Sequence, residues 1–332
     1  MQIPENKYQV VIIGGGPIGI ACALEAEKKG LSYVILEKGC LVNSLYHYPT
    51  NMTFFSTSEK LELDNIPFIS NNPKPGKREA LEYYRRIATN NKVNIHLFEK
   101  VTAVRSNKKN THTVITSKSE YEAENVIVAT GFYDIPNYLG IKGEELPKVS
   151  HYYNDPHYYA TQKTIVVGAS NSAVDAALEI YRKGGDVTMI VRKPEIGERV
   201  KYWVRPDIIN RIEEGSIKAY FNSSIKEIKE NEVVLDTLQG EDILENDFVL
   251  LLTGYRPNFG FLQDMGIKLS DDGRKIPLYD EKTMETNVPG IFLAGVICGG
   301  VETHKWFIEN SRIHAKIIMQ TIDKKNTLLT EK

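Results

Sequence analysis

The same strand–turn–helix–strand unit occurs twice in this 332-residue chain. In the first copy an apolar strand runs into the glycine-rich turn 14–19, and after a helical stretch a second apolar strand ends at Glu37. In the second copy the turn lies at 168–173, and the second strand ends at Arg192. Because such a unit binds a dinucleotide at its turn, two copies predict two dinucleotides and electron transfer between them.

The first turn has the complete dinucleotide-binding pattern. Gly14, Gly16 and Gly19 fill the three positions of Gly-x-Gly-x-x-Gly, which permit a sharp bend, the approach of a pyrophosphate and close packing of helix on strand. Glu37 follows Gly19 by 18 residues, about where an acid binds the ribose hydroxyls. The pyrophosphate is expected at the positive end of the helix that follows the turn.

The second turn is less regular, and the second strand of its unit ends at positively charged residues. Gly168, Ser170 and Ala173 occupy the three glycine positions. Arg192 stands where the first unit has its acid, and Lys193 follows it. A cation at this position can bind a 2′-phosphate, which predicts NADPH as the ligand. The alternative is that both side chains are only solvated at the end of a strand.

Composition favours a soluble cytoplasmic protein. The net charge is −2 and the pI is about 6.4, with no basic block for nucleic acid and no basic amphipathic helix for a membrane surface. The first eight residues are polar and unlike a signal peptide, and the longest apolar runs have the length of strands. Three scattered cysteines, Cys22, Cys40 and Cys298, cannot make a disulfide framework. We predict no metal site.

A second repeat occurs at the scale of a domain. Each unit is followed by a helical segment and by short alternating strands that predict a three-stranded meander, packed as a layer on one face of the parallel core. Each then has a last strand before a Thr-Gly pair: 125–129 before Thr130-Gly131, and 248–252 before Thr253-Gly254. A last strand at 290–295 and a helix over 303–321 are expected to complete the first domain. The predicted fold class is therefore α/β, with two Rossmann-like domains, each with a meander, and the second domain inserted in the first. The predicted borders are 1–135 and 258–325 for the first domain, 136–257 for the inserted domain and 326–332 for a flexible tail.

These features resemble the two-dinucleotide flavoproteins, the superfamily of thioredoxin-reductase-like pyridine nucleotide-disulfide oxidoreductases. Three longer stretches, at 48–56, 201–207 and 307–314, make the chain most similar to the bacillithiol-disulfide reductase family, whose members lack a redox disulfide. The resemblance covers nearly the whole chain. It implies a homodimeric enzyme with FAD in the first domain and NADPH in the inserted one, which reduces a low-molecular-weight disulfide.

The resemblance also assigns cofactor-binding residues by position. Those for FAD are Gly14, Gly16, Pro17, Ile18, Gly19, Glu37, Lys38, Thr53, Phe54, Val101, Thr130, Gly131, Gly295 and Val296. Those for NADPH are Gly168, Ser170, Asn171, Ser172, Ala173, Arg192, Lys193 and Lys201.

The chain departs from the wider superfamily in its cysteines and in one carboxylate. It has no Cys-x-x-Cys, which excludes a relay through two neighbouring protein thiols. The C-terminal Gly-Asp of the superfamily is Gly295-Val296 here, and Ile18 replaces the cysteine that many bacillithiol-linked members carry in the glycine-rich loop. Cys298 is the remaining candidate for a catalytic residue: we predict that a helix N-terminus lowers its pKa. The alternative is a packed thiol.

Three other functions stay open. A ferredoxin- or flavodoxin-NADP reductase shares the architecture and also lacks the cysteine pair. A flavin monooxygenase would suit the second turn, but the Phe-x-Gly expected ahead of His151 is absent. A non-catalytic FAD or NADPH sensor would change conformation without turnover. The electron acceptor is thus either a small disulfide or a small redox protein.

Overall fold

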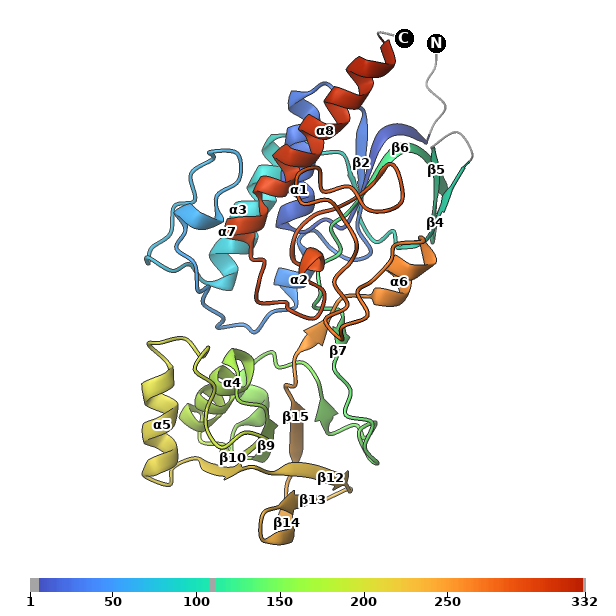
Figure 1. Ribbon diagram of the computed structural model, residues 1–332. Coiled ribbons are helices and arrows are strands. Elements are labelled where there is room, and N and C mark those ends of the chain that lie inside the picture. Colours follow the sequence, from blue (N-terminus) through green and yellow to red (C-terminus); the bar gives the residue numbers. More distant parts are fainter. Residues whose placement is uncertain (1–5, 108–110, 331–332) are drawn as a thin grey trace. The chain divides into compact units, whose positions relative to one another are not determined.

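The computed structural model describes residues 6–107 and 111–330, which form two compact units (Figure 1). The second unit is inserted into the first, and it also takes up a short segment from the N-terminal half. The described parts of the first unit are 6–47, 52–107, 111–135 and 255–330, and the second unit consists of Tyr48–Asn51 and Pro136–Gly254.

The first unit is built on a seven-stranded sheet in the order β3-β2-β1-β6-β5-β4, with β17 also paired to β6. The pairs among β3, β2, β1, β6 and β17 are parallel, whereas β4–β5 and β5–β6 are antiparallel. Strands buried on both faces read as continuous apolar runs, which is why β2 and the last four residues of β1 do. The strands are β1 (Lys7–Ile13), β2 (Tyr33–Leu36), β3 (Ile95–His96), β4 (Val101–Ser106), β5 (His112–Thr116), β6 (Glu120–Val128) and β17 (Ile291–Leu293).

Strand β6 joins the parallel part of this sheet to the meander. Its first half alternates between exposed and buried residues and pairs with β5, and its second half is buried throughout and pairs with β17. The meander is therefore continuous with the parallel sheet, whereas the sequence predicts it as a separate layer. The reason is that β6 starts at Glu120, five residues before the predicted start of this strand at Asn125.

The helices of the first unit differ in how they are buried. α1 (Pro17–Lys28) buries eight of its twelve residues because it packs against both β2 and α8 (Figure 1). α3 (Lys77–Asn90) is amphipathic and buries one face at helical spacing. The remaining helices are α2 (Asn43–Tyr46), α6 (Phe259–Asp264), α7 (Ile308–Ser311) and α8 (Ile313–Thr330).

The C-terminal helix differs from its predicted bounds. Phe307 N–H donates to Asn310 Oδ1 at 2.7 Å, and the chain becomes helical only after this cap, at Ile308 rather than at 303. No glycine or proline follows to end α8, which continues to Thr330. Residues 326–330 are thus helical and not the predicted tail, and positions 331–332 lie outside the described residues.

The second unit has a parallel sheet in the order β11-β10-β9-β15-β8 and a separate antiparallel sheet, β12-β13-β14, which is the predicted meander. Its main helices are α4 (Asn171–Arg182) and α5 (Arg205–Glu213). The short strands β7 (Ile135–Pro136) and β16 (Tyr255–Arg256) lie where the chain passes from one unit to the other. The other strands are β8 (Val149–Ser150), β9 (Lys163–Val167), β10 (Asp186–Val191), β11 (Lys218–Phe221), β12 (Ser224–Ile228), β13 (Glu232–Thr237), β14 (Gly240–Glu245) and β15 (Phe248–Leu251).

The second unit encloses a core of its own on both faces of its parallel sheet. On one face Val166 and Met189 pack with α4, and on the other Ile165 and Ile190 pack with the β12-β13-β14 sheet.

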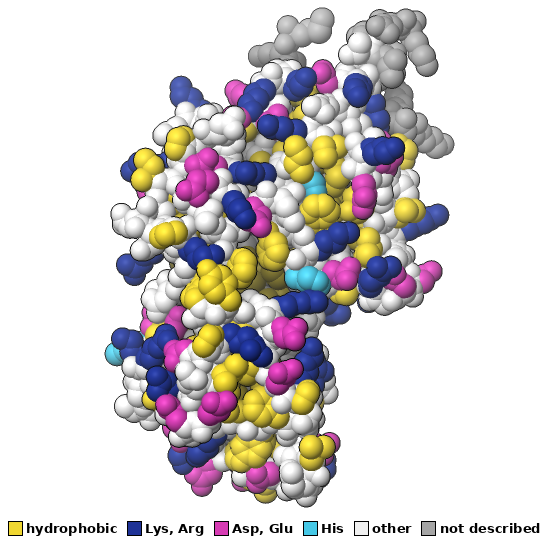
Figure 2. All heavy atoms as spheres, turned by 60° about the vertical axis from the view of Figure 1, so that its left-hand side comes forward, with side chains coloured by type: hydrophobic (Ala, Val, Ile, Leu, Met, Phe, Trp, Pro, Cys, Tyr) yellow, Lys and Arg dark blue, Asp and Glu magenta, His cyan; other side chains and the backbone are white. Residues whose placement is uncertain are grey.

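Charges of both signs are interspersed on the face of the molecule shown in Figure 2, in keeping with the net charge of −2. Within residues 6–107 and 111–330, no helix combines the length and the hydropathy needed to cross a bilayer.

Candidate functional site

In the first unit, the segments that follow four parallel strands meet at one edge of the sheet. Backbone hydrogen bonds connect the ends of β2, β1, β6 and β17 in turn: Gly14 N–H to Leu36 O at 2.9 Å, Ala129 N–H to Ile13 O at 2.9 Å and Ala294 N–H to Val128 O at 3.0 Å. The carboxyl edge of a parallel sheet is where α/β proteins bind their ligands. The predicted glycine turn lies at this edge.

Each glycine of the first turn has its own steric reason. Gly14 has a φ of +112°, and a Cβ there would lie 2.6 Å from Ala129 O. A Cβ on Gly19 would lie 1.9 Å from Gly14 O, so α1 packs too closely on β1 for any side chain. A Cβ on Gly16 would meet nothing within 4 Å. The space beside Gly16 is therefore open to a ligand, which is the role the pattern predicts for the second glycine.

The start of α1 has the properties of an anion site. Gly16 is the N-cap, and the first turn of the helix contains no acid that would neutralise its positive end. Thr130 Oγ1 is buried, and no group among the described residues bonds to it. Its backbone lies beside the turn, with Cα 3.3 Å from where a Gly14 Cβ would be. Because a buried hydroxyl without a partner is costly, a ligand oxygen at this place would stabilise the protein.

Glu37 connects the second strand to the glycine turn. Its carboxylate accepts hydrogen bonds from Gly15 N–H at 2.7 Å and from Gly39 N–H at 2.8 Å. Burial raises the pKa of Glu37, and these two bonds oppose the rise. A carboxylate offers about four lone-pair positions, so two remain for the predicted ribose hydroxyls.

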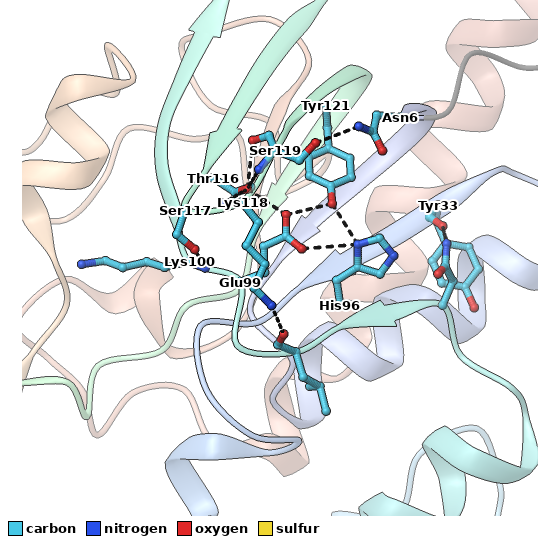
Figure 3. Close-up of polar contacts among 12 residues, drawn as sticks. Asn6, Tyr33, His96, Glu99, Lys100, Thr116, Ser117, Lys118, Ser119 and Tyr121 are labelled. Carbon is cyan, nitrogen blue, oxygen red and sulfur yellow. Dashed lines mark hydrogen bonds and ion pairs between the residues drawn. The ribbon is translucent and has the colours of Figure 1, made fainter.

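Figure 3 shows a buried carboxylate that the sequence did not reveal, that of Glu99. Glu99 Oε1 accepts hydrogen bonds from Thr116 Oγ1 at 2.7 Å and from Tyr121 OH at 2.8 Å, and Oε2 lies 3.5 Å from His96 Nδ1. In the sequence Glu99 precedes a lysine and looks like a solvated turn residue. Its partners come from β3, β5 and β6, so no local pattern could have identified it.

The Glu99 cluster supports the backbone of Glu37. Glu37 N–H donates to His96 O at 2.9 Å, and Glu99 N–H donates to Glu37 O at 2.8 Å. Phe98 N–H also donates to Gly39 O at 3.0 Å. The segment that carries the predicted ribose-binding acid is thus held by three backbone bonds, next to a buried carboxylate that accepts two hydrogen bonds.

Three further residues predicted for FAD have other partners in the structure. Lys38 Nζ forms an ion pair with Asp134 at 2.6 Å. Thr53 bridges to Gly76, and Phe54 N–H donates to Pro75 O at 3.0 Å, so the segment before α3 holds both residues. Their place relative to FAD stays a prediction.

Gly295 brings the C-terminal return segment to the first turn. Its φ is +88°, and a Cβ there would lie 3.4 Å from Ile18 Cγ1. Gly295 and Ile18 therefore face each other at the start of α1 although they are far apart in the sequence. Val296 follows in a short 3₁₀ helix. Val101 is buried at the start of β4, and Gly131 takes a left-handed conformation after β6.

Cys298 lies in the 3₁₀ helix Val296–Gly299 and is fully buried. Burial raises the pKa of its thiol, so the predicted lowering is wrong. The helix is only four residues long, and the protein interior around it disfavours a thiolate. Cys22 in α1 is also buried, and burial raises its pKa to about 12. A redox role for Cys298 stays a prediction.

The turn of the second unit repeats the geometry of the first. Gly168 N–H donates to Ile190 O at 3.1 Å, and Leu252 N–H donates to Val167 O at 3.0 Å, so the ends of β10, β9 and β15 meet. Gly168 has a φ of +133°, and a Cβ there would lie 2.6 Å from Leu252 O. The requirement for glycine is thus as strict at Gly168 as at Gly14.

The start of α4 is a second open helix end. Ser170 is the N-cap, and the first turn contains no acid. Ser170 and Ser172 are exposed, whereas Ala173 is buried against the turn. The Asn171 side chain is engaged: its Nδ2 donates to Arg199 O at 3.2 Å. This bond holds the loop that follows β10 next to the helix end.

That loop, residues 192–200, carries the predicted cations. Arg192 and Lys193 are exposed where β10 ends, and Gly197 N–H donates to Ala169 O at 3.1 Å, which folds the loop over the turn. Arg199 is exposed in the same loop and is not among the NADPH-binding residues predicted from the sequence. Its position only seven residues after Arg192 is the sequence feature that could have indicated it.

Lys201 is placed differently from the other predicted cations. It is buried, with Nζ 2.6 Å from Asp175 Oδ2, and its backbone N–H donates to Asn171 Oδ1 at 2.8 Å. Its charge is therefore already balanced within the protein.

A protein-family model described as pyridine nucleotide-disulphide oxidoreductase matches residues 11–295. The chain belongs to this family. Bacilliredoxin reductase Bdr of Bacillus subtilis is 42% identical over 320 residues, which cover 96% of this chain and 98% of that protein. The solved structure of bacillithiol disulfide reductase Bdr (YpdA) from Bacillus cereus has a TM-score of 0.94 at 40% identity, covering 96% of this chain and 99% of that one.

A more distant relative is a ferredoxin–NADP reductase of Ignicoccus hospitalis, 28% identical over 297 residues, which are 86% of this chain and 89% of that protein. The family makes this protein an oxidoreductase with the fold of the thioredoxin-reductase-like flavoproteins. The relatives thereby agree with the fold and the enzyme class predicted from the two turns.

Proposed function

We propose that this oxidoreductase takes electrons from NADPH and passes them through FAD to a low-molecular-weight disulfide of the bacillithiol type. The supporting observation is the pair of open helix ends at the two glycine turns, of which one is followed by the acid Glu37 and the other by the cation Arg192. The acceptor is inferred from the relatives, which include a bacilliredoxin reductase and a bacillithiol disulfide reductase.

The residues of the first unit fit FAD. The N–H groups at the start of α1 would bind its pyrophosphate beside Gly16, Glu37 would accept the ribose hydroxyls, and Thr130 Oγ1 would gain its missing hydrogen bond. When bound, FAD supplies a ring that accepts a hydride and gives up an electron pair. The protein supplies the binding groups and the buried surroundings.

The residues of the second unit fit NADPH. The start of α4 would bind the pyrophosphate, and the exposed cations Arg192, Lys193 and Arg199 would bind the 2′-phosphate. Each charge-assisted hydrogen bond of this kind contributes roughly 1.5–3 kcal/mol. NADH lacks the 2′-phosphate, so these cations favour NADPH.

The purified protein is expected to be yellow, with a flavin absorbance that NADPH bleaches under anaerobic conditions. The reduced protein is then mixed with bacillithiol disulfide, other small disulfides, ferredoxin, flavodoxin or oxygen, and re-oxidation is followed by absorbance. The disulfides are expected to re-oxidise it fastest. A colourless protein that rejects added FAD would end the proposal, and re-oxidation by ferredoxin or flavodoxin alone would favour the second candidate, a ferredoxin–NADP reductase.

The same assay decides the role of Cys298. If this buried thiol only packs, the Cys298→Ser variant keeps both the reduction by NADPH and the turnover with disulfide. If the thiol exchanges with the substrate, the variant is still reduced by NADPH and loses disulfide turnover. The two half-reactions therefore separate the packing role from the redox role.

We also propose that the enzyme is cytoplasmic, as its composition favours, and a homodimer, as the resemblance implies. Light scattering coupled to gel filtration measures the mass in solution, which is expected at twice that of the 37.6-kDa chain. A mass equal to that of one chain would contradict the dimer.

A further inference from the structure

His314 lies near the start of α8, in the stretch 307–314 that carries part of the family resemblance, and no cofactor assignment above gives it a role. Its side chain is 2% exposed. His314 Nδ1 accepts a hydrogen bond from Gly295 N–H at 3.1 Å. Since Gly295 faces Ile18 at the start of α1, this bond connects α8 to the predicted FAD turn.

The Gly295 N–H needs this acceptor. Strand β17 ends at Leu293, so no neighbouring strand pairs with Gly295, and Gly295 is itself buried. A buried N–H without an acceptor is costly, and nearly all such groups in folded proteins are bonded. The left-handed backbone of Gly295 turns its N–H toward α8, where His314 accepts it.

The His314 ring suits an acceptor. An imidazole accepts at Nδ1 only when it is neutral, with its proton on Nε2. Burial lowers the pKa of His314 to about 4, which keeps the ring neutral near pH 7. Trp306 packs edge-on against it with ring centroids 4.6 Å apart, and Cys298 Sγ lies 3.9 Å from Nδ1. These neighbours fix the orientation of the ring.

The rest of the stretch 307–314 holds the start of α8 in place. Ser311 Oγ donates to Phe307 O at 2.5 Å, and the Arg312 guanidinium donates to Glu62 O. Polar side chains of this stretch thus donate hydrogen bonds to backbone carbonyls of the same unit. These bonds place His314 next to Gly295.

We propose that His314 is a positioning residue for the flavin site, because by accepting the Gly295 N–H it holds the Gly295 turn against Ile18. His314 acts through the backbone and takes part in no electron or proton transfer. The consequence for FAD rests on the function proposed above, whereas the consequence for the Gly295 backbone does not.

Three variants separate the acceptor role from packing. His314→Leu removes the acceptor but fills the space, and His314→Asn offers an oxygen in its place. His157→Leu makes the same change at an exposed histidine of the second unit and is the control. The dissociation constant of FAD for the apoprotein, followed by quenching of flavin fluorescence, is expected to rise about 10- to 100-fold in His314→Leu. It is expected to stay near the wild-type value in the other two variants.

A second measurement tests the backbone without FAD. Hydrogen exchange of the Gly295 amide in the apoprotein is expected to be slow in the wild type and in His314→Asn, and faster in His314→Leu. If His314→Leu does not fold, His314→Ala takes its place with the same expectation. Equal weakening of FAD by the Asn and Leu variants, or unchanged Gly295 exchange in the Leu variant, would overturn the inference. A wild-type protein that binds no FAD would instead refute the proposed function.

Discussion

At the scale of single residues, the two turns differ in their charged side chains: carboxylates near the first turn are buried, and cations near the second are exposed. Around the first turn Glu37 and Glu99 are buried and accept hydrogen bonds from neighbouring groups. Around the second turn Arg192 and Arg199 are exposed at the end of a strand and in a loop. Loss of a buried group therefore affects both stability and cofactor binding, whereas loss of an exposed cation affects only the ligand that it contacts.

Replacing Arg192 by alanine is expected to raise the KM for NADPH about 10- to 100-fold and to leave the KM for NADH nearly unchanged. The reason is that the guanidinium can bind the 2′-phosphate, which only NADPH carries. Steady-state kinetics with both coenzymes measure the effect, and Arg105→Ala, at an exposed arginine of the first unit, is the control. Equal losses for the two coenzymes would contradict the assigned role.

His314 is expected to make the apoprotein less stable in acid. Its pKa is about 4 in the folded protein and 6.5 in the unfolded chain, so as the pH falls below about 6.5 the unfolded state takes up the proton first. The stabilisation is complete above pH 6.5 and is lost toward pH 4. Between pH 7 and pH 5 the free energy of urea unfolding should fall by about 2 kcal/mol more in the wild type than in His314→Asn. An identical pH dependence in both proteins would show that the ring is not held neutral.

At the scale of elements, each strand–turn–helix connection requires glycine where two backbones touch and accepts other residues elsewhere. Gly14 and Gly168 occupy equivalent places, with positive φ and a carbonyl oxygen 2.6 Å from an added Cβ in both cases. Ser170 replaces the second glycine of the other unit, which shows that this place has room for a side chain. Steric contact at the turn thus explains why the second pattern is degenerate.

Alanine substitutions in the first turn should separate folding from binding. Gly16→Ala meets no atom within 4 Å, so the stability of the apoprotein should be kept or rise by about 0.4–1 kcal/mol, while FAD binding weakens because the methyl group fills the open space. Gly19→Ala meets Gly14 O at 1.9 Å and should prevent stable folding of the first unit. Thermal unfolding and FAD titration measure the two effects, with Gly260→Ala in α6, where contact is ordinary, as the control. Full FAD affinity in Gly16→Ala would contradict the proposed pyrophosphate position.

At the scale of the whole molecule, the chain interrupts one α/β unit to insert another. The inserted unit has core clusters on both faces of its sheet, and all of their residues lie within Pro136–Gly254. The only part of it from outside this range is Tyr48–Asn51, where Asn51 Nδ2 donates to Glu179 Oε2 at 3.3 Å. The insertion thus has a hydrophobic core of its own, as an independent domain does.

The isolated fragment 136–254 is therefore expected to fold and to bind 2′,5′-ADP. Circular dichroism should show one cooperative thermal transition, and the ligand should raise its midpoint in the wild-type fragment but much less in the Arg192→Ala fragment. Adding residues 48–51 as a peptide should have little effect, because few hydrogen bonds hold that segment. A fragment that remains unfolded would show that the insertion depends on the first unit.

Four features can be predicted from the sequence alone: the two turns, the α/β class, the repeated plan and the charged residue at the end of the second strand of each unit. These signals are local: glycines at fixed spacing, apolar runs of strand length, and the residue at the end of each second strand. Family resemblance added FAD as the ligand of the first unit and a low-molecular-weight disulfide as the substrate. The same local signals misplaced the start of β6 and the bounds of the last helix, because a strand shared between two sheet partners and a cap by Asn310 depend on neighbours.

Which polar groups are buried, and which groups they bind, depends on tertiary contacts. No sequence pattern indicates that Glu99, Lys201 and His314 are buried, yet each is buried against partners from other elements. Cys298 has a raised pKa for the same reason, since desolvation depends on everything packed around the thiol. Burial and hydrogen bonding are properties of segments brought together by folding, so a pattern within one short stretch of chain does not contain them.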